Sequence, residues 1–598
     1  MNNSVSLKPW NICLSAVLLA SVAGCNVAPA SLNSDQDGFS DRVDAQLSAA
    51  QTKCLDLATA RGVPDFQNAT TLILSATLVP EGEGADTAPA HCDVEGEINR
   101  RTSPVDGQEY AIRFRMRLPV DQWNGRFLQL GGGGSNGKPP TALGGIPGEA
   151  PDGLARGFAV IATDAGHNNE TNYRAGSGGA AAFGMDPQAR RDHFYNAYDE
   201  VAQAGKVLTE WFYASEPTFS YFVGCSEGGR EAMLMSQRFP DYFDGIIAGA
   251  PQFLQPMQSL SSVAGTQVLA EEAGNRGLID ADGRPAINKV FSDKDLDLAA
   301  SAIRAACDGL DGLEDGLVYN IKACTTESVM AELERHSCDD TKTDECLLLS
   351  QISVLKALHA PARNSAGEIL YPGFPWDPGV VSAQSGFRAW WLGDYEKDSS
   401  NSVRFRFSPM MLEMVWHTPP RPFKADDAPD IALEYDYASM SANPAENYPA
   451  TEMYPDAPGR AMVVSSTDLS AFKASGGKLM VWAGVADPTH SLYQTTDWVD
   501  RMRNLNGERT NDFLRMFTIP GMAHCRGGPT TDQFDLLQPL MDWVEAGQPP
   551  KTILAQSSKP LLPGNEPVAR PLCTWPSYAR YDGIGSSSDA SSFVCVTE

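Results

Sequence analysis

The residues best suited to chemistry form the sequence Gly224-Cys225-Ser226-Glu227-Gly228, between an apolar run and a stretch compatible with a helix. A Gly-x-Ser-x-Gly sequence in that setting is typical of a nucleophile elbow, where a strand turns sharply into a helix with the serine at the apex. The glycines are needed because a larger side chain would clash in so tight a turn. The helix N-terminus offers N–H groups and a partial positive charge to an oxyanion. We therefore predict that Ser226 is a catalytic nucleophile.

A serine nucleophile needs a base that takes its proton and an acid that orients the base. In α/β-hydrolases these residues follow in the order Ser, Asp or Glu, His. His524 comes after the apolar run 513–519, and Asp487 comes after the run 478–484. Both positions lie at the carboxyl end of a predicted strand, although a single loop histidine is more often a surface residue. Their joint order and placement predict a catalytic triad of Ser226, His524 and Asp487.

Four consecutive glycines, Gly131 to Gly134, directly follow the strand-like run 125–130. No Gly-Lys-Ser/Thr sequence follows them, which argues against a nucleotide-binding loop. In serine hydrolases a glycine-rich loop after an early strand supplies an N–H group to the oxyanion hole, as in lipases. The alternative is a flexible turn.

The elements around these residues alternate between strand and helix. Apolar runs predict five early strands, and the spacing of 192–213 predicts a helix before the strand that ends at the elbow. The five strands are 71–78, 110–118, 125–130, 158–164 and 245–250. This α/β alternation predicts a doubly wound, mostly parallel sheet, the core of an α/β-hydrolase.

The alternation stops in the middle of the chain and resumes at 478–484 and 513–520. Residues 252–460 instead carry helical stretches, local cysteine pairs and clusters of Trp, Pro and Met. We predict a catalytic domain made of 46–251 and 461–598, with 252–460 inserted as a large lid domain.

The charge of the chain argues against two classes of partner. It has 46 basic and 75 acidic residues, a formal net charge of −29 at pH 7. No basic patch could easily outweigh that field, so nucleic acid and anionic lipid headgroups are poor partners. We expect a small substrate and a monomeric protein.

The first 25 residues are typical of an export signal. Lys8 precedes an apolar stretch, 12–23, that is too short to span a membrane. Small residues then lead to Cys25, which resembles a bacterial lipoprotein processing site; an ordinary signal peptide cut nearby is the alternative. Residues 26–45 are small and polar, typical of a tether. We expect an exported protein, either an outer-membrane lipoprotein or a periplasmic or extracellular one, that touches a membrane only through a lipid at Cys25.

The cysteines fit an oxidising compartment. Two of the twelve lie in the first 25 residues, and the ten that remain predict five disulfides. Local pairing suggests Cys54–Cys92, Cys307–Cys324, Cys338–Cys346 and Cys573–Cys595. Cys225 and Cys525 are left, next to Ser226 and His524, and a bond between them would clamp the nucleophile to the base. It would close a loop of about 300 residues, worth at most about 5 kcal/mol in the chain-entropy model. The alternative is that both are buried thiols.

Three short motifs are similar to those of a known family. They are Gly-Cys-Ser-Glu-Gly-Gly at 224–229, Gly-x-Ala-Asp at 484–487 and His-Cys at 524–525. In these the chain resembles the tannase and feruloyl esterase family of serine esterases. Within that family it is most similar to the mono(2-hydroxyethyl) terephthalate hydrolases. The similarity covers most of the chain, with further matches such as 123–127 and 388–393.

The resemblance implies roles for the predicted residues. Ser226 would be the nucleophile, His524 the base and Asp487 the orienting acid. The backbone N–H groups of Gly134 and Glu227 would form the oxyanion hole. The resemblance also supports the five disulfides.

The segment 307–317 places acidic side chains among glycines. Several carboxylates in a tight loop repel one another unless a hard cation lies among them, and oxygen ligands suit Ca²⁺. The spacing is not that of an EF-hand, and a solvated acidic turn is the alternative. The resemblance implies a structural lid calcium whose ligands are the side chains of Asp308, Asp311 and Asp315 and the backbone oxygens of Leu313 and Leu317.

The same resemblance implies a substrate pocket in which aromatic rings enclose the substrate ring and an arginine binds a free carboxylate. Trp390 and Phe407 match the aromatic positions, and Ser408 follows as expected. The arginine position falls on Val403 or on Arg404. Where the family has an aromatic residue after the catalytic acid, this chain has His490.

These departures, together with Met411 and Ala483 at two further pocket positions, weaken the prediction of a terephthalate monoester. If Arg404 turns inward, an acid-bearing aromatic ester is expected. If it does not, a feruloyl or galloyl ester is expected.

The sequence thus predicts an exported serine carboxylesterase that hydrolyses esters of aromatic acids through an acyl-enzyme. The substrate implied by the resemblance is mono(2-hydroxyethyl) terephthalate, giving terephthalate and ethylene glycol, with no organic cofactor. A feruloyl esterase or tannase is the alternative enzyme. The alternative from another class is a non-catalytic polyphenol-binding lipoprotein, against which the intact Ser, Asp and His argue.

Overall fold

The computed structural model describes residues 48–59, 64–82, 88–145, 152–339, 341–562 and 566–597. These residues belong to one compact unit, Ser48–Glu598. No helix among the described residues is long and apolar enough to cross a membrane. The predicted signal (1–25) and the predicted tether (26–45) lie outside the described residues.

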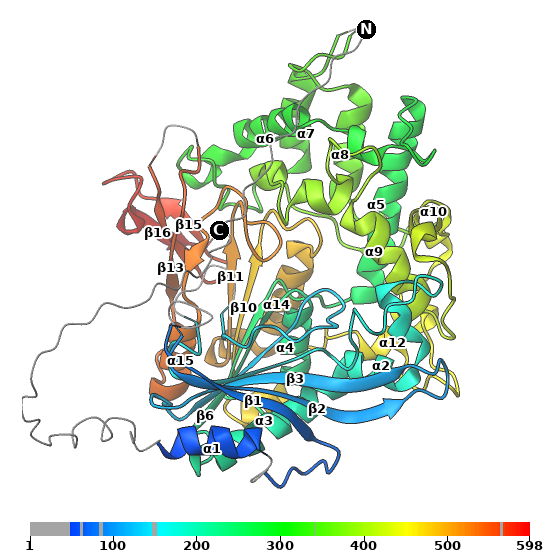
Figure 1. The fold of residues 1–598 in the computed structure, drawn as a ribbon. Helices are drawn as coiled ribbons and strands as arrows, with labels where there is room; N and C mark the ends of the chain where they lie inside the picture. The colour runs from blue at the N-terminus through cyan, green and yellow to red at the C-terminus, as the bar shows by residue number, and fades with distance from the viewer. Residues whose placement is uncertain are drawn as a thin grey trace, which may run out of the picture. The chain divides into compact units, whose positions relative to one another are not determined.

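A nine-stranded sheet forms the centre of this unit (Figure 1). Its strands, in spatial order, are β1 (Leu72–Val79), β2 (His91–Thr102), β3 (Glu109–Pro119), β5 (Ala159–Thr163), β4 (Arg126–Leu130), β6 (Phe219–Cys225), β7 (Gly245–Gly249), β10 (Lys478–Gly484) and β11 (Leu514–Ile519). From β5 to β11 every neighbouring pair is parallel, whereas β1, β2, β3 and β5 pair antiparallel. The predicted mostly parallel α/β sheet is confirmed.

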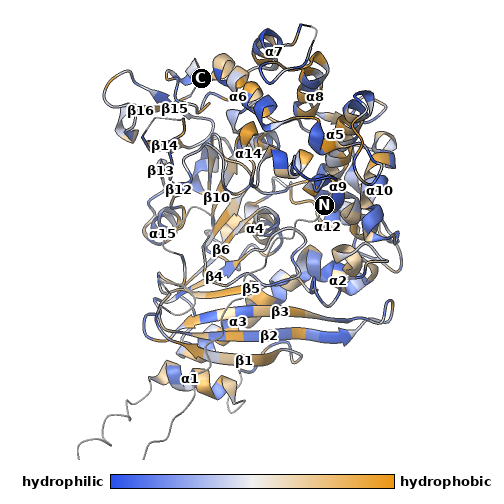
Figure 2. Ribbon diagram, turned by 45° about the horizontal axis from the view of Figure 1, so that its top comes forward, coloured by the Kyte–Doolittle hydropathy of each residue, from blue (hydrophilic) through white to orange (hydrophobic). Residues whose placement is uncertain are grey.

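Alternate residues of the parallel strands enter two separate cores. In β6, Phe222 packs in a core shared with α3 (Ala197–Tyr213), α4 (Glu227–Arg238) and α14 (Leu492–Asn506). The neighbouring Tyr221 and Val223 pack on the other face, together with α15 (Leu537–Ala546). Because both faces are covered, these strands are continuous apolar runs, which Figure 2 shows as hydrophobic ribbons. That pattern is why the sequence revealed them.

Several strands lack that signal and were not predicted. The second strand, β2, carries charged side chains such as Asp93, which pairs with Arg115 of β3. Two smaller sheets near the end of the chain contain β12 (Gln533–Phe534), β13 (Thr552–Gln556), β14 (Ala569–Cys573), β15 (Tyr578–Tyr581) and β16 (Phe593–Val596). These strands are short or have one exposed face, so they lack a continuous apolar run.

Between β7 and β10 the chain is mostly helical. The helices are α5 (Gln255–Asn275), α6 (Asp293–Cys307), α7 (Thr326–Arg335), α8 (Leu349–His359), α9 (Val403–Met411), α10 (Ala428–Glu434), α11 (Pro444–Asn447), α12 (Pro458–Ala461) and α13 (Ser470–Ala474), with a small hairpin of β8 (Ala362–Arg363) and β9 (Ile369–Tyr371). The remaining helices are α1 (Ala49–Ala58) and α2 (Pro187–Arg191). In Figure 1 helices α6, α7 and α8 lie above the central sheet, and α9 and α10 lie on its right. The segment 252–460 that we predicted as a lid lies within this region, and its role as a lid stays a prediction.

All five predicted cysteine pairs are bonded in the structure. They are Cys54–Cys92, Cys225–Cys525, Cys307–Cys324, Cys338–Cys346 and Cys573–Cys595. The long-range bond joins the end of β6 to the loop after β11, residues 300 positions apart.

Candidate active site

Ser226 lies at the sharp turn between β6 and α4. Its backbone has φ +68° and ψ −124°, a strained conformation for a residue other than glycine. The turn leaves no room for side chains at its glycines. A Cβ on Gly224 would lie 2.4 Å from the Gly228 carbonyl oxygen, and one on Gly229 would lie 2.2 Å from that of Gly249. The predicted elbow is therefore present, with the glycines in the positions that the turn requires.

The structure brings Ser226, His524 and Asp487 into one hydrogen-bonded row. His524 Nε2 lies 2.7 Å from Ser226 Oγ, and His524 Nδ1 lies 2.8 Å from Asp487 Oδ2. Each residue follows the carboxyl end of a parallel strand, namely β6, β11 and β10. These ends meet at one edge of the sheet, which is where open α/β sheets bind ligands.

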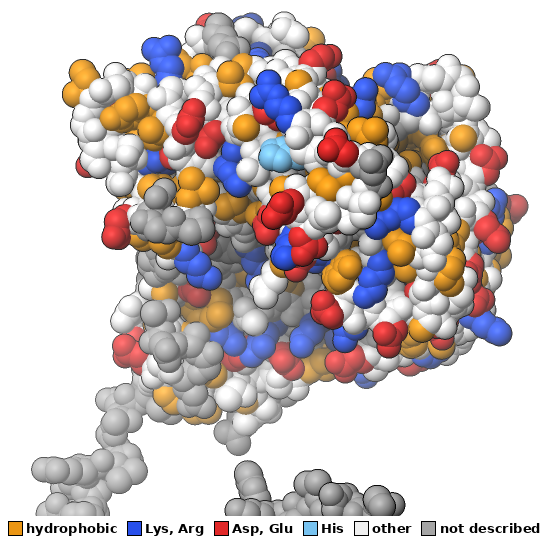
Figure 3. All heavy atoms as spheres, turned by 90° about the horizontal axis from the view of Figure 1, so that it is seen from above, with side chains coloured by type: hydrophobic (Ala, Val, Ile, Leu, Met, Phe, Trp, Pro, Cys, Tyr) orange, Lys and Arg blue, Asp and Glu red, His pale blue; other side chains and the backbone are white. Residues whose placement is uncertain are grey.

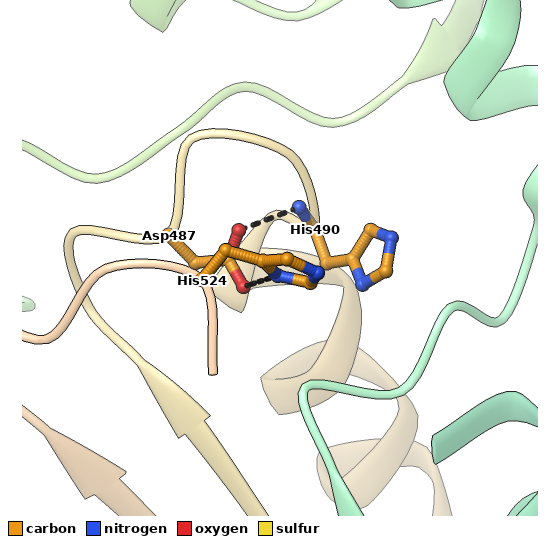
Figure 4. Close-up of side chains that lie close together, drawn as sticks. All are labelled: Asp487, His490 and His524. Carbon is orange, nitrogen blue, oxygen red and sulfur yellow. Dashed lines mark hydrogen bonds and ion pairs between the residues drawn. The ribbon is translucent and has the colours of Figure 1, made fainter. Parts of the chain in front are cut away.

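The second oxygen of Asp487 is held by backbone N–H groups. Asp487 Oδ1 accepts hydrogen bonds from the N–H of Thr489 (2.9 Å) and of His490 (3.0 Å). Figure 4 shows the carboxylate between the His524 ring and this backbone, with the His490 ring turned away from it. The orientation of the carboxylate toward His524 is thus fixed at both oxygens.

The surroundings favour an ionised Asp487 and a neutral His490. Burial acts to raise the pKa of Asp487, but the nearby His524 and its hydrogen bond hold this pKa below its ordinary value. Burial, with a smaller effect of His524, lowers the pKa of His490 to about 3. His490 Nδ1 contacts the Ala250 carbonyl at 2.8 Å. The ring is therefore a neutral, buried neighbour of the row and does not compete for Asp487.

A pocket of about 670 Å³ opens at Ser226. Its lining includes the glycine-rich loop, the elbow, residues from the 140–145 segment and parts of the helical region. Among the lining residues are Gly131 to Gly134, Asp152, Ser226, Ser385, Trp390, His524, Cys525 and Arg526. A volume of this size accommodates a small aromatic ester.

Two backbone N–H groups were predicted as oxyanion donors. Gly134 lines the pocket with φ +62°, a conformation that favours glycine. Glu227 is the first residue of α4, where helix geometry leaves an N–H without an intrahelical acceptor. The glycine-rich loop and the helix end also touch, because the Gly228 N–H donates to the Gly132 carbonyl at 3.0 Å.

Of the predicted substrate-binding residues, the structure brings Trp390 to this pocket. Its ring meets the His524 ring edge-on, with 5.2 Å between centroids. Arg404, Phe407, Ser408 and His490 are not among the residues that line the pocket.

Arg404 is turned into the core of the helical region. It is 1% exposed, its guanidinium lies 3.5 Å from the centre of the Trp391 ring, and its Nη2 donates to the Pro488 carbonyl. Burial lowers its pKa below the ordinary value. The sequence left the direction of this side chain open, and in the structure it does not face the pocket.

A cation that sequence reasoning missed does face it. Arg526 directly follows the His524-Cys525 motif, is exposed, and forms no ion pair with another described residue. Its position directly after the predicted base His524 and the predicted disulfide residue Cys525 was a signal that could have identified it. Asp152 brings an acidic group to the same pocket, and burial raises its pKa.

The acidic loop predicted to bind calcium contains buried carboxylates. Asp308 and Asp311 are 4% and 3% exposed. Burial, together with the charge of Asp315, raises the pKa of Asp311 to about 8 and that of Asp308 to about 6. Their oxygens accept hydrogen bonds from nearby backbone N–H groups, and Asp315 pairs with Arg570. Buried carboxylates that raise one another's pKa fit the donor chemistry of a hard cation.

Among the described residues, one cluster could hold a metal ion by its geometry, namely Asp487, His490 and His524. Each offers one potential ligand atom, and these three atoms lie within 4.8 Å of one another. The aspartates of the acidic loop are not such a group. In the first group both nitrogens of His524 already contact Ser226 and Asp487. Hydrogen bonding within the row therefore accounts for this cluster without a metal.

The sheet, the elbow and the residues at its edge define an α/β-hydrolase. Residues 92–596 match the family model described as "Tannase and feruloyl esterase". The chain belongs to this family.

Named relatives and solved structures agree with that assignment. The chain is 39% identical to the mono(2-hydroxyethyl) terephthalate hydrolase of Piscinibacter sakaiensis over 564 residues, 92% of each chain. Its fold is similar to feruloyl esterase B from Aspergillus oryzae (TM-score 0.68, 23% identity, covering 92% of this chain and 100% of that one). It is also similar to the tannin acyl hydrolase from Aspergillus niger (TM-score 0.62, 20% identity, covering 91% and 94%).

Proposed function

We propose that the protein is an exported serine carboxylesterase that hydrolyses esters of aromatic acids. The observation that carries this proposal is the row Ser226–His524–Asp487, with distances of 2.7 and 2.8 Å, whose Ser226 and His524 line a pocket. Family membership supports the same chemistry, because the relatives are named as ester hydrolases.

Each residue of the row has a defined task. His524 takes the proton of Ser226 as the hydroxyl attacks the ester carbonyl, and Asp487 keeps Nδ1 of His524 protonated and stabilises the imidazolium. The N–H groups of Gly134 and Glu227 stabilise the oxyanion. His524 then protonates the departing alcohol, leaving an acyl-enzyme, and activates a water molecule that releases the acid and regenerates Ser226.

An aromatic acid is the substrate class that the pocket supports best. The Trp390 ring stands beside His524, where it can contact the ring of a bound ester. The relative from Piscinibacter sakaiensis is named for a terephthalate monoester, and the fungal relatives for feruloyl and tannin esters. All three names describe esters of aromatic acids.

Two observations bear on the choice between these esters. Arg404 is buried away from the pocket, which favours a feruloyl or galloyl ester without a free carboxylate. Arg526 lies at the pocket and has no described ion-pair partner, which favours a terephthalate monoester whose free carboxylate it could bind. We propose the terephthalate monoester as the substrate and a phenolic ester as the second candidate.

The test is turnover of mono(2-hydroxyethyl) terephthalate beside methyl ferulate and methyl gallate, for the wild type, Ser226→Ala and Arg404→Ala. We expect turnover of at least one ester by the wild type and none by Ser226→Ala with its fold retained. An active alanine variant would refute the mechanism, and an inactive wild type would favour a non-catalytic polyphenol-binding protein.

We also propose that Ca²⁺ stabilises the helical region. Asp308, Asp311 and Asp315 would hold it with the backbone oxygens of Leu313 and Leu317, and the ion would neutralise their charge. The ion would be structural, since these residues are not in the Ser226–His524–Asp487 row. No organic cofactor is needed for the proposed reaction.

Export is part of the proposal. Five disulfides support folding in an oxidising compartment. We propose a monomer with a lipid at Cys25 as its one contact with a membrane, and no nucleic-acid partner. In the view of Figure 3 acidic and basic side chains are interspersed, which gives that face no basic patch for nucleic acid.

A further inference from the structure

Glu231, in the first turns of α4, is a buried carboxylate to which the reaction gives no role. It is 0% exposed and lies one helical turn after the elbow. Its Oε2 accepts a hydrogen bond from the Gly132 N–H at 2.9 Å, and its Oε1 accepts one from Asn136 Nδ2, also at 2.9 Å. Both bonds go to the loop that contains Gly134. One carboxylate thus holds this loop at two points, on either side of the proposed oxyanion donor.

The loop and the helix approach too closely for any side chain to lie between them. A Cβ on Gly131 would lie 2.5 Å from the Gly228 Cα and 2.9 Å from Glu231 Oε2. The loop backbone is also tied to β6, because the Gly131 N–H donates to the Val223 carbonyl at 2.9 Å. The residues before Gly134 are therefore fixed to the same strand and helix that carry Ser226.

After Gly132 the loop turns and is anchored again at Asn136 and Gly137, where the Gly137 N–H donates to the Asp164 carbonyl at 2.8 Å. The Asn136 N–H closes a turn onto the Gly133 carbonyl at 2.9 Å, and the Asn136 side chain then reaches back to Glu231. Gly134 lies within this turn, at φ +62°, with open space where a Cβ would be. The direction of its N–H therefore depends on the two ends of the turn. Glu231 holds the first end through Gly132 and shares the second, where the Asn136 carbonyl also accepts from Asn169 Nδ2 at 2.7 Å.

We propose that Glu231 is a positioning residue that fixes the oxyanion loop and so aims the Gly134 N–H at the reacting carbonyl. This inference rests on the proposed serine esterase function. An oxyanion donor is worth a factor of about 100 to 1000 in kcat when it is correctly placed. Small displacements of such groups are costly.

The environment of Glu231 makes its ionised form costly to hold. Burial, together with the charge of Glu227, raises the pKa of Glu231 to about 7, and Arg230 acts in the opposite direction. The Tyr198 hydroxyl belongs to the same cluster, because it accepts a hydrogen bond from Asn136 Nδ2 at 3.3 Å. The ionised carboxylate is the stronger acceptor for both donors, because protonation turns one oxygen into a hydroxyl with less acceptor capacity. The buried carboxylate of Glu231 makes both of these hydrogen bonds to the loop that contains Gly134, which is consistent with a positioning role.

A donor–acceptor exchange tests the role directly. In Glu231→Gln one oxygen can still accept from Gly132, but the new amide opposes the Asn136 amide. Adding Asn136→Asp exchanges donor and acceptor at positions 231 and 136. In this double variant the amide introduced by Glu231→Gln donates to the carboxylate introduced by Asn136→Asp. The double variant also has the net charge of the wild type. We expect Glu231→Gln to lower kcat about tenfold or more with KM changed less than about twofold. We expect the double variant to recover most of kcat.

The control is Glu97→Gln, the same change at another fully buried glutamate, which pairs with Arg100 on β2. It should leave kcat unchanged, whatever its effect on Tm. If Glu231→Gln does not fold, the double variant is compared with Asn136→Asp alone. We then expect the double variant to have the higher kcat.

The outcomes separate this inference from the proposed function. Equal turnover by the wild type and by Ser226→Ala would refute the proposed serine esterase function. An active wild type whose kcat is unchanged by Glu231→Gln, or a double variant no more active than its singly substituted parents, would overturn the positioning role while leaving the function intact.

Discussion

Cys225 and Cys525 are 300 positions apart in the sequence, and their disulfide joins the residue before Ser226 to the residue after His524. The two groups that exchange a proton in the proposed reaction are therefore linked covalently as well as by a hydrogen bond. Cys525 has φ +58°, an uncommon conformation for a cysteine. The disulfide therefore limits, through covalent bonds, how far the end of β6 can move from the loop after β11.

Removing this disulfide should therefore reduce catalysis more than removing another. For Cys225→Ala/Cys525→Ala we expect kcat to fall at least about tenfold because the Ser226–His524 distance is no longer fixed. The control is Cys573→Ala/Cys595→Ala, which opens a shorter loop of 22 residues. We expect it to lower Tm but to leave kcat within about twofold of the wild type. Equal losses of kcat in both variants would show that the long-range bond acts through stability alone.

Replacing Asp487 with asparagine should disable the base without disturbing the fold. The side-chain amide introduced by Asp487→Asn can present an N–H to His524 and favours the wrong tautomer, with a loss of kcat of up to about 10⁴-fold. Because the asparagine side-chain oxygen can still accept from the N–H groups of Thr489 and His490, we expect Tm to fall by only a few degrees. Turnover of a chromogenic ester, with circular dichroism as the test of folding, checks both. A variant with more than a tenth of wild-type kcat would exclude Asp487 as the orienting acid.

The proposed calcium site should respond to pH. The raised pKa values mean that the folded, metal-free protein binds protons at Asp311 below about pH 8 and at Asp308 below about pH 6. Calcium needs the ionised carboxylates, so its stabilising effect should be full above pH 8 and should decline as the pH falls through 8 and then 6. We expect calcium to raise Tm by a few degrees at about pH 8.5 and by less at about pH 5.5.

The matched variants for this site are Asp311→Asn and Asp377→Asn. Asp377 is also a buried aspartate whose pKa burial raises to about 6, but it lies outside the acidic loop and binds the N–H of Gly379 and Gly521. Asp311→Asn should abolish the effect of calcium on Tm, and Asp377→Asn should preserve it. If both variants keep the response, the ion binds elsewhere.

How far the sequence predicts this molecule depends on how local each signal is. The elbow follows from Gly224, where a Cβ would clash with the Gly228 carbonyl that the turn itself brings close, and the parallel strands follow from continuous apolar runs. Gly228 is required for a different reason, because a Cβ there would lie 2.8 Å from the carbonyl oxygen of Gly132 in the loop after β4. The direction of Arg404 does not follow from its neighbours in sequence. The direction of Arg404 depends on its contacts with the Trp391 ring and with the carbonyl of Pro488, 84 positions away. The residues next to Arg404 in the sequence do not indicate these contacts.

The same limit explains Glu231 and Arg526. Glu231 looks like an ordinary polar residue of a helix, and only the approach of the loop around Gly132 gives it partners. Arg526 reaches the pocket because the disulfide holds Cys525 beside Ser226. The chemistry of the nucleophile could be predicted from residue types and order, whereas the groups that surround a substrate could not.

Substrate choice should depend on Arg526 and not on Arg404. For Arg526→Gln we expect KM for mono(2-hydroxyethyl) terephthalate to rise about threefold to tenfold, since an exposed ion pair contributes modestly, with no change for methyl ferulate. For Arg404→Met we expect an unchanged KM for both esters, because a buried arginine without an ion-pair partner among the described residues can be replaced by an apolar residue of similar size. A rise in KM for the charged ester in Arg404→Met alone would show that Arg404 turns into the pocket when substrate binds.

The glycine-rich loop offers a test of oxyanion stabilisation that leaves the Ser226–His524–Asp487 row untouched. A Cβ on Gly131 would lie 2.5 Å from the Gly228 Cα, so Gly131→Ala must push the loop away from α4. Gly133, two residues on, has no atom within 4 Å of a Cβ and no positive φ, so Gly133→Ala fits without movement. The two variants make the same chemical change in the same loop.

We therefore expect Gly131→Ala to lower kcat at least about tenfold, as displacement of an oxyanion donor should, while Gly133→Ala stays within about twofold of the wild type. Covalent labelling of Ser226 by an organophosphate gives a second measurement, because its rate also depends on stabilising a developing negative charge. It should fall with kcat in Gly131→Ala. If Gly131→Ala keeps full kcat while its Tm falls, the contact between loop and helix stabilises the fold, and the Gly134 N–H is not a donor whose placement limits the reaction.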